Sequence, residues 1–294
     1  MKTNEFPGIQ QAADKASNKA QKYYMRLMKA NLIIGVVAAF IAIYNFQQDE
    51  PKIFVYIISL FLLVTTLALT GLVKYFKFED IWYKSRALTE SIKTLTWRYV
   101  TCSENFESTL SENHVQKSFT DSLHILQNQF PDLLVSLDSD LLNLESITAK
   151  MNKIRNEHWN KRLKFYLQER IQDQIDWYTS KTRFNKKHKA IWLYLVLFFQ
   201  ILSIICCLIL ILNPSTSWNL VGLFTTLSAS AIAWLELRQF HSLIQAYTTA
   251  SMELTLIKSI GDSIPDEEQF TKYVLDSENA ISREHTMWLA QRRK

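Results

Sequence analysis

Residues 190–212 read AIWLYLVLFFQILSIICCLILIL, without a single Asp, Glu, Lys or Arg. A helix rises about 1.5 Å per residue and the hydrocarbon core of a bilayer is about 30 Å thick, so roughly 20 apolar residues cross it. Three further charge-free stretches are 30–46, 53–73 and 218–235. One such stretch could be a buried core helix, but four in one chain favour an integral membrane protein. The stretches form two closely spaced pairs, so we expect four transmembrane helices arranged as two hairpins.

The polar remainder of the chain predicts an all-helical protein. Five glycines and five prolines in 294 residues are few, and helix-forming residues fill the segments outside the spans. From Leu141 to Tyr178, apolar residues recur at helical spacing. Pro131 marks a helix junction within 128–132, because proline cannot continue a helix. We therefore expect an all-α integral membrane protein whose long cytoplasmic amphipathic helices form a helical bundle.

The placement of positive charge predicts the orientation in the membrane. Lys and Arg cluster before and after each predicted hairpin, whereas the connections 47–52 and 213–217 carry one Lys between them. Segments rich in Lys and Arg stay in the cytoplasm. Both termini and the central segment are therefore expected in the cytoplasm, with both hairpin tips facing out.

The two halves of the chain look like diverged copies of one unit. An aromatic pair, Tyr23–Tyr24 or Trp177–Tyr178, precedes an Asn by seven residues in each half, at Asn31 and Asn185. After the predicted hairpins, two segments share Ala and Glu at matching places, 86–92 and 249–255. Both copies enter the membrane from the same side, so the expected repeat is parallel.

These positions resemble the SLATT family, the two-transmembrane effector domains found beside nucleotide-sensing components in bacterial conflict systems. The second copy carries the pattern at Trp177, Tyr178, Lys181, Asn185, 186–189, Arg238, Tyr247, Ala250, Glu253, Glu278, Ile281, Glu284 and Trp288. The first copy carries it at Asn31, Trp82, Arg86, Ala87, Glu90, Trp97 and Arg98. The predicted division is a lead-in at 1–20, a first unit at 21–130, a connecting cytoplasmic helix at 131–170 and a second unit at 171–294. A tandem departs from the usual single unit.

The resemblance implies an effector of the bacterial inner (plasma) membrane that forms a homo-oligomeric, ion-conducting pore. It further implies gating by a partner or by a nucleotide or oligonucleotide made by a neighbouring nucleotidyltransferase, with membrane depolarisation and growth arrest. Its partners would be the lipid bilayer and further copies of itself, and no duplex nucleic acid is expected. The alternative is a non-conducting membrane scaffold that recruits a soluble defence enzyme through its cytoplasmic helices.

A pore needs a wall that tolerates water, and small or hydroxyl-bearing residues in the spans are the candidates. The pore-lining candidates are Ser59, Thr66 and Thr70 in the second span, Gln200 and Ser203 in the third, and Gly222, Thr226 and Ser230 in the fourth. Lys74 and Glu236 would lie at the cytoplasmic mouth. The other interpretation is that these residues let membrane helices pack closely and hydrogen-bond to one another.

A second candidate site combines phosphate-pairing charge with aromatic stacking surfaces. The nucleotide-binding candidates are Lys153, Arg155, Trp159, Lys161, Arg162 and Tyr166. Acidic residues interrupt this set, so a solvated helix face is the alternative. We find no glycine-rich phosphate loop, nucleophile elbow or metal-spaced cluster of His, Cys and Glu. We therefore expect no catalytic residues, no metal, no cofactor and no enzyme activity.

Overall fold

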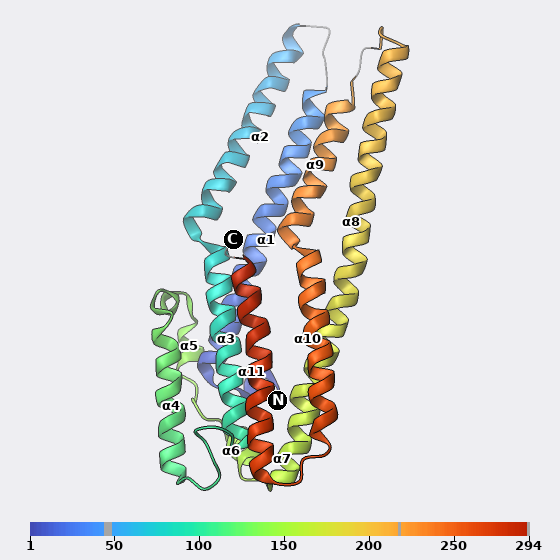
Figure 1. Cartoon of the computed structure of the whole chain (residues 1–294). Coiled ribbons are helices and arrows are strands. Elements are labelled where there is room, and N and C mark those ends of the chain that lie inside the picture. The colour runs from blue at the N-terminus through green and yellow to red at the C-terminus, as the bar shows by residue number, and fades with distance from the viewer. Residues whose placement is uncertain (44–48, 217–218, 293–294) are drawn as a thin grey trace. The chain divides into compact units, whose positions relative to one another are not determined.

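The computed structural model describes residues 1–43, 49–216 and 219–292, and the side chains of 1–43, 53–216 and 219–282. Every regular element in these ranges is a helix (Figure 1), which confirms the predicted all-helical class. In chain order the elements are η1 (Thr3–Glu5), α1 (Gly8–Ala42), α2 (Asp49–Phe76), α3 (Phe78–Thr101), α4 (Glu112–Asn128), η2 (Pro131–Ser136), α5 (Ser139–Leu142), α6 (Ala149–Arg155), α7 (Trp159–Tyr166), η3 (Leu167–Gln172), α8 (Asp173–Leu212), α9 (Val221–Arg238), α10 (Phe240–Gly261) and α11 (Glu267–Arg292).

The chain folds into two compact units, and each unit takes segments from both halves of the sequence. The first unit consists of Met1–Gln21, Glu79–Thr182 and Gln245–Lys294. The second unit consists of Lys22–Phe78 and Arg183–Ile244. The helices α1, α8 and α10 therefore contribute residues to both units. The predicted division into successive segments along the chain stays a prediction.

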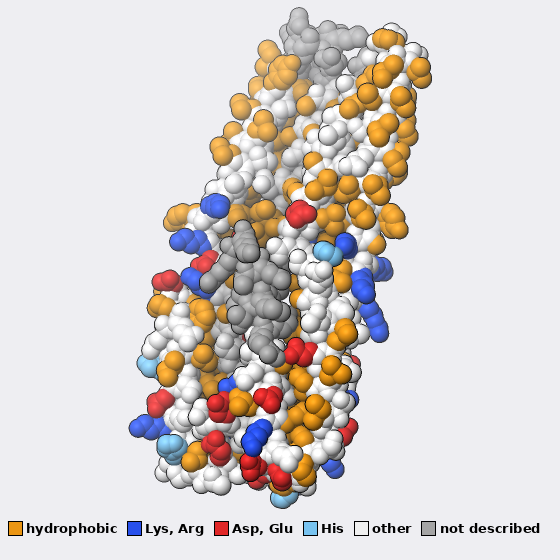
Figure 2. Space-filling model, viewed as in Figure 1, with side chains coloured by type: hydrophobic (Ala, Val, Ile, Leu, Met, Phe, Trp, Pro, Cys, Tyr) orange, Lys and Arg blue, Asp and Glu red, His pale blue; other side chains and the backbone are white. Residues whose placement is uncertain are grey.

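The second unit contains the apolar stretches, and their large side chains are exposed. Leu67 of α2 is 74% exposed and Tyr194 of α8 is 70% exposed. Figure 2 shows hydrophobic side chains over the visible surface around α2 and α8. Such a surface fits lipid rather than water.

Three helical stretches of the described residues are long and apolar enough to cross a membrane: Gly8–Ala42, Ile53–Thr101 and Trp159–Leu212. The helix α9 is not among them, and its last turn carries Glu236 and Arg238. The predicted first and fourth spans, the two connections at the hairpin tips, and the side chains of Glu284 and Trp288 lie partly or wholly outside the described residues. The membrane-protein class is therefore supported, whereas the four-span count stays a prediction.

Polar contacts join neighbouring helices within the second unit. The amide nitrogen Nδ2 of Asn31 on α1 donates to Oγ1 of Thr70 on α2 at 3.3 Å. The hydroxyl of Ser228 on α9 donates to the carbonyl of Val196 on α8 at 3.5 Å. These bonds pair α1 with α2 and α8 with α9.

In the second unit, α2 and α9 are each followed by a residue with a left-handed backbone. Lys77, between α2 and α3, has φ 48°, and Gln239, between α9 and α10, has φ 49°. A phenylalanine follows each of them. Non-glycine residues rarely adopt this conformation, so its occurrence at matching places supports a duplicated unit. Lys77 therefore separates α2, which contains the second predicted span, from α3.

The first unit has an aromatic core. Tyr99 packs on Phe119 with ring centroids 4.7 Å apart, and Tyr166 contacts Trp97 at 5.7 Å and Phe270 at 6.4 Å. All five side chains are at most 2% exposed. Because these residues come from α3, α4, α7 and α11, the core joins segments from both sequence halves.

The segment 131–170, predicted as one connecting helix, is divided into η2, α5, α6, α7 and most of η3, which corrects that prediction. Side-chain caps begin three of these helices: Asp138 accepts from the backbone nitrogen of Asp140, Thr148 from that of Met151, and His158 from that of Asn160. Each cap satisfies a backbone donor that a continuous helix would pair internally. The predicted junction at 128–132 does occur, between α4 and η2.

Candidate functional site

The predicted pore-lining hydroxyls on α2 bond mainly to their own helix. The hydroxyl of Thr66 donates to the carbonyl of Leu63 at 2.8 Å, and that of Thr70 to the carbonyl of Thr66 at 2.9 Å. Ser59 is half-buried. Such back-bonding satisfies a hydroxyl in an apolar setting, so these side chains suit either packing or a pore wall.

The candidates on α8 and α9 divide into paired and open positions. The hydroxyls of Ser203 and Thr225 are 3.2 Å apart, so Ser203 joins α8 to α9. The hydroxyl of Thr226 donates to the carbonyl of Gly222 at 2.8 Å. No atom would lie within 4 Å of a Cβ built on Gly222, and Gln200 is exposed.

The remaining membrane-unit candidates have no common location that the structure defines. Ser230 is half-buried on α9, and both predicted mouth residues, Lys74 and Glu236, are exposed. These placements leave their predicted roles as predictions.

Arg155, one of the nucleotide-binding candidates, already has hydrogen-bond partners within the fold. The guanidinium of Arg155 donates to the carbonyls of Tyr99 at 2.9 Å, Phe106 at 2.8 Å and Glu107 at 3.4 Å. It also lies over the Tyr99 ring at 5.1 Å from the centroid. Arg155 therefore satisfies the carbonyls at the end of α3 and in the following loop rather than awaiting a phosphate.

The other candidates do not form one exposed patch either. Arg162 is buried, donates to the carbonyl of Thr101 at 3.0 Å and forms an ion pair with Glu267. Tyr166 is fully buried. Trp159 is partly buried against the core, Lys161 pairs with Glu157 at 2.9 Å, and Lys153 is exposed. The spacing that indicated a recognition surface instead places the arginines and the tyrosine inside the bundle.

The buried polar centre of the first unit is an ion pair that the sequence did not reveal. Arg170 donates from Nε and Nη2 to the two carboxylate oxygens of Glu278, each at 2.8 Å. The hydroxyls of Tyr166 and Thr94 donate to the same carboxylate at 3.0 Å and 2.9 Å. Both members of the pair are at most 1% exposed. The carboxylate thus accepts four hydrogen bonds, as a buried charge requires.

Burial and nearby charge shift the pKa values of Arg170 and Tyr166 in this centre. Burial opposes the charged form of Arg170, but the charge of Glu278 outweighs it and raises the pKa of the guanidinium above its ordinary value. Burial, with the nearby carboxylate, raises the pKa of Tyr166 well above its usual range. Arg170 is therefore a permanent cation, and Tyr166 a permanent hydrogen-bond donor, at neutral pH.

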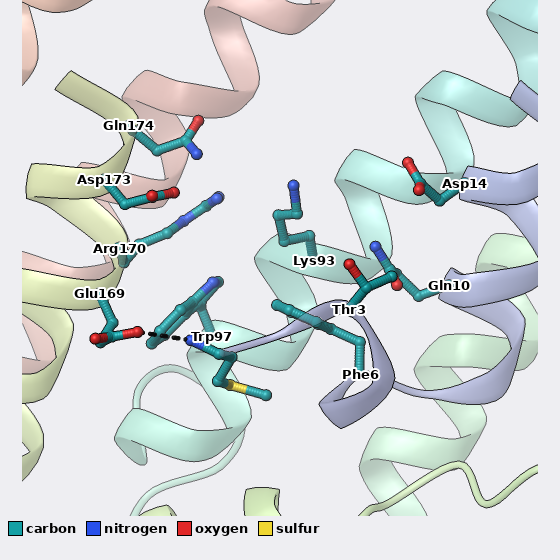
Figure 3. Close-up of a pocket in the computed structure, with 11 residues that line it drawn as sticks. Thr3, Phe6, Gln10, Asp14, Lys93, Trp97, Glu169, Arg170, Asp173 and Gln174 are labelled. Atoms are coloured by element: carbon teal, nitrogen blue, oxygen red, sulfur yellow. Dashed lines mark hydrogen bonds and ion pairs between the residues drawn. The ribbon is translucent and has the colours of Figure 1, made fainter. Parts of the chain in front are cut away.

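A pocket of about 140 Å³ opens beside this centre in the first unit. Figure 3 shows Gln10 and Asp14 of α1 on one side, Arg170 and Asp173 on the other, and Lys93 of α3 between them. The remaining lining residues are Met1, Thr3, Phe6, Trp97, Glu169 and Gln174. Arg170 belongs to η3, a single π-helical segment, and such segments occur often at functional sites.

Most charged groups of the pocket wall already have partners. Arg170 pairs with Glu278 at 2.8 Å, Lys93 lies 3.5 Å from Glu90, and Glu169 lies 3.0 Å from the nitrogen of Met1. Among the described residues, no cationic group lies within 4.0 Å of the carboxylates of two other wall residues, Asp14 and Asp173.

One buried polar atom in the wall also lacks a partner. Gln10 is 3% exposed, and its Oε1 accepts no hydrogen bond within the described part of the chain. No local sequence signal could have found this pocket or the ion pair beside it, because Arg170 and Glu278 are 108 positions apart.

Two family models match the chain in tandem. Residues 7–163 match SMODS and SLOG-associating 2TM effector domain 3, and residues 166–288 match SMODS and SLOG-associating 2TM effector domain 1. A search of curated proteins and a search of solved structures give no match. The resemblance predicted from aromatic and charged positions is therefore confirmed as a tandem. The chain belongs to the SLATT family, the two-transmembrane effector domains of anti-phage and conflict systems.

Proposed function

We propose that the protein is a channel-forming effector of the bacterial inner membrane, with four transmembrane helices and both termini in the cytoplasm. The observation that carries the proposal is the tandem match to two-transmembrane effector domains on helices whose large apolar side chains are exposed. Opening of the channel would dissipate ion gradients and stop growth. The chain would act without catalysis of its own.

Contacts inside the first unit support an even number of crossings. Lys15, before α2, pairs with Asp138, and Arg170, before the membrane part of α8, pairs with Glu278 on α11. Residues that pack together lie on one side of a membrane. The chain must therefore return to that side after each of its two second-unit segments, Lys22–Phe78 and Arg183–Ile244. If α2 and α8 cross the bilayer, α1 and α9 must therefore cross it too.

A polar side chain in the third predicted span supports assembly. Gln200 is exposed on α8, within the apolar stretch 190–212. An amide facing hydrocarbon is costly and is usually turned toward a protein neighbour or water. We infer that Gln200 faces either a second copy or an aqueous path, and a second copy would make the protein a homo-oligomer.

The signal that opens the channel belongs to the proposal as well. The family description couples these domains with SMODS, which favours a nucleotide-derived ligand made by a neighbouring nucleotidyltransferase. The exposed Lys153 and Lys161 remain the candidates for contact with such an anion, although Lys161 also pairs with Glu157. Arg155 and Arg162 are held by partners inside the fold.

The test is conductance of purified full-length protein in planar bilayers. We expect discrete currents that Gln200→Leu and Thr226→Leu reduce at least tenfold, because each replaces a polar wall with an apolar one. The matched control is Ile204→Leu, an exposed apolar position on α8 that should leave the currents unchanged. A silent bilayer from folded, oligomeric protein would contradict the channel and favour the scaffold.

A further inference from the structure

We propose that the pocket beside Arg170 binds a small organic cation that carries primary ammonium groups. The binding itself follows from the pocket, and only its consequence for gating rests on the proposed function. Three acceptors in the pocket wall could receive such a ligand. Among the described residues, Asp14 and Asp173 have no ion-pair partner, although Oδ2 of the half-buried Asp14 accepts from the side-chain amide of Asn18 at 3.0 Å and Asp173 is exposed. The Oε1 atom of the 97% buried Gln10 accepts no hydrogen bond within the same part of the chain.

The neighbouring cations do not remove this excess of acceptors. Arg170 and Lys93 each have a carboxylate partner of their own. The charge of Arg86 acts on Asp14, but Arg86 pairs with Glu90 at 2.8 Å. A ligand with positive charge therefore complements the carboxylates of Asp14 and Asp173, and its N–H groups would satisfy the Oε1 atom of Gln10, since a buried acceptor without a donor is costly.

The size and composition of the pocket restrict the ligand further. A volume of about 140 Å³ in this partly open pocket has room for a small molecule only. The wall includes Trp97 and Phe6, and aromatic rings attract ammonium groups. A phosphate would be repelled by Asp14 and Asp173, while the cationic groups of the wall, on Met1, Lys93 and Arg170, already pair with carboxylates. Among the described residues, no group of three or more His, Cys, Asp or Glu side chains could hold a metal ion.

The position of the pocket gives occupancy a mechanical consequence. Gln10 and Asp14 belong to α1, which continues to Ala42 in the second unit, and Asp173 begins α8, which continues to Leu212. Figure 3 shows these residues on facing walls. A cation held by both walls would tie together the first-unit parts of two helices that enter the membrane unit. On the proposed function, occupancy would change how often the channel opens.

The direct test is isothermal titration calorimetry of the full chain in detergent at constant ionic strength. The probe is putrescine, and its neutral analogue butanediol is the control ligand. We expect saturable binding of putrescine at one site and none of butanediol. Asp14→Asn and Asp173→Asn should each weaken binding about tenfold, the factor that corresponds to about 1.4 kcal/mol. Asp121→Asn, an exposed position on α4 outside the pocket, should not change it.

A third variant separates binding from folding. Gln10→Leu removes the unpartnered amide, so it should raise the unfolding temperature of the ligand-free protein while weakening putrescine binding. Equal binding of putrescine and butanediol, or full affinity in both Asp→Asn variants, would overturn the proposal and leave a pocket that holds water only. Binding that persists beside a silent planar bilayer would instead count against the channel.

Discussion

At the scale of single residues, the first unit depends on one buried carboxylate. Glu278 neutralises Arg170 and accepts from Tyr166 and Thr94, so α11 is tied to η3, α7 and α3 through one side chain. A satisfied buried network specifies one arrangement of helices, whereas a broken one leaves an uncompensated charge.

We therefore predict that Glu278→Gln destabilises the protein by about 3–5 kcal/mol, because Arg170 would keep its charge without a counter-ion. Thermal unfolding in detergent, followed by tryptophan fluorescence, measures the loss. The control is Glu268→Gln on the same helix, whose ion pair with Lys272 is solvent-exposed and should leave stability nearly unchanged. Recovery of stability in the double variant Arg170→Met with Glu278→Leu would confirm that the unpaired charge is the cause.

A second residue-scale prediction concerns alkaline pH. Burial raises the pKa of Tyr273 to about 12. The folded protein therefore retains a proton that the unfolded chain releases near pH 10, so stability should fall between about pH 10 and about pH 12. Phenolate absorbance and unfolding temperature over this range measure the effect. Tyr273→Phe should make the fall shallower, and an unchanged slope would contradict the assignment.

At the scale of elements, the breaks at Lys77 and Gln239 are equivalent features of the two copies. Each ends a helix of the second unit with a left-handed residue, a position that helices most often fill with glycine. The structure thus extends the sequence repeat to the backbone.

We predict that Gln239→Val destabilises the protein by about 1–2 kcal/mol, because a β-branched side chain is strained at φ 49°. Gln239→Gly should be neutral or stabilising. Lys77→Val and Lys77→Gly should show the same order if the two breaks are equivalent. Unfolding temperatures of the four variants test this, and equal tolerance of Val and Gly would rule out the strain.

At the scale of the whole molecule, the number of membrane crossings can be read from single cysteines. In a background without Cys102, Cys206 and Cys207, we predict that Asn213→Cys reacts with a membrane-impermeant thiol reagent in intact cells. Lys272→Cys and Lys161→Cys, both exposed positions of the first unit, should react only after permeabilisation. Reaction of Lys272→Cys but not of Lys161→Cys in intact cells would mean that α8 and α9 do not both cross.

Much of this architecture could be predicted from local sequence patterns, whereas the pocket and the buried ion pair could not. Hydropathy located the apolar helices, and the matching aromatic pairs indicated the repeat. The same approach did not reveal that Arg155 and Arg162 donate to carbonyls within the fold and Tyr166 to the carboxylate of Glu278. An interleaved run of basic and aromatic residues looks alike in sequence whether it faces solvent or packs inside a bundle. The caps that divide 131–170 were visible as residue types, but apolar spacing continued across them.

The sequence by itself determined the helical class, the membrane-type stretches and the tandem unit, because these depend on the free energy of burying one face or one span of a local segment. Only the tertiary structure decided that Arg170 meets Glu278 and that Gln10, Asp14 and Asp173 surround one pocket. Those pairings depend on how distant helices pack. Hydrophobic spacing indicates which face of a helix is buried, but it does not indicate which other helix covers that face. Charge partners across the fold are therefore a property of the packed molecule.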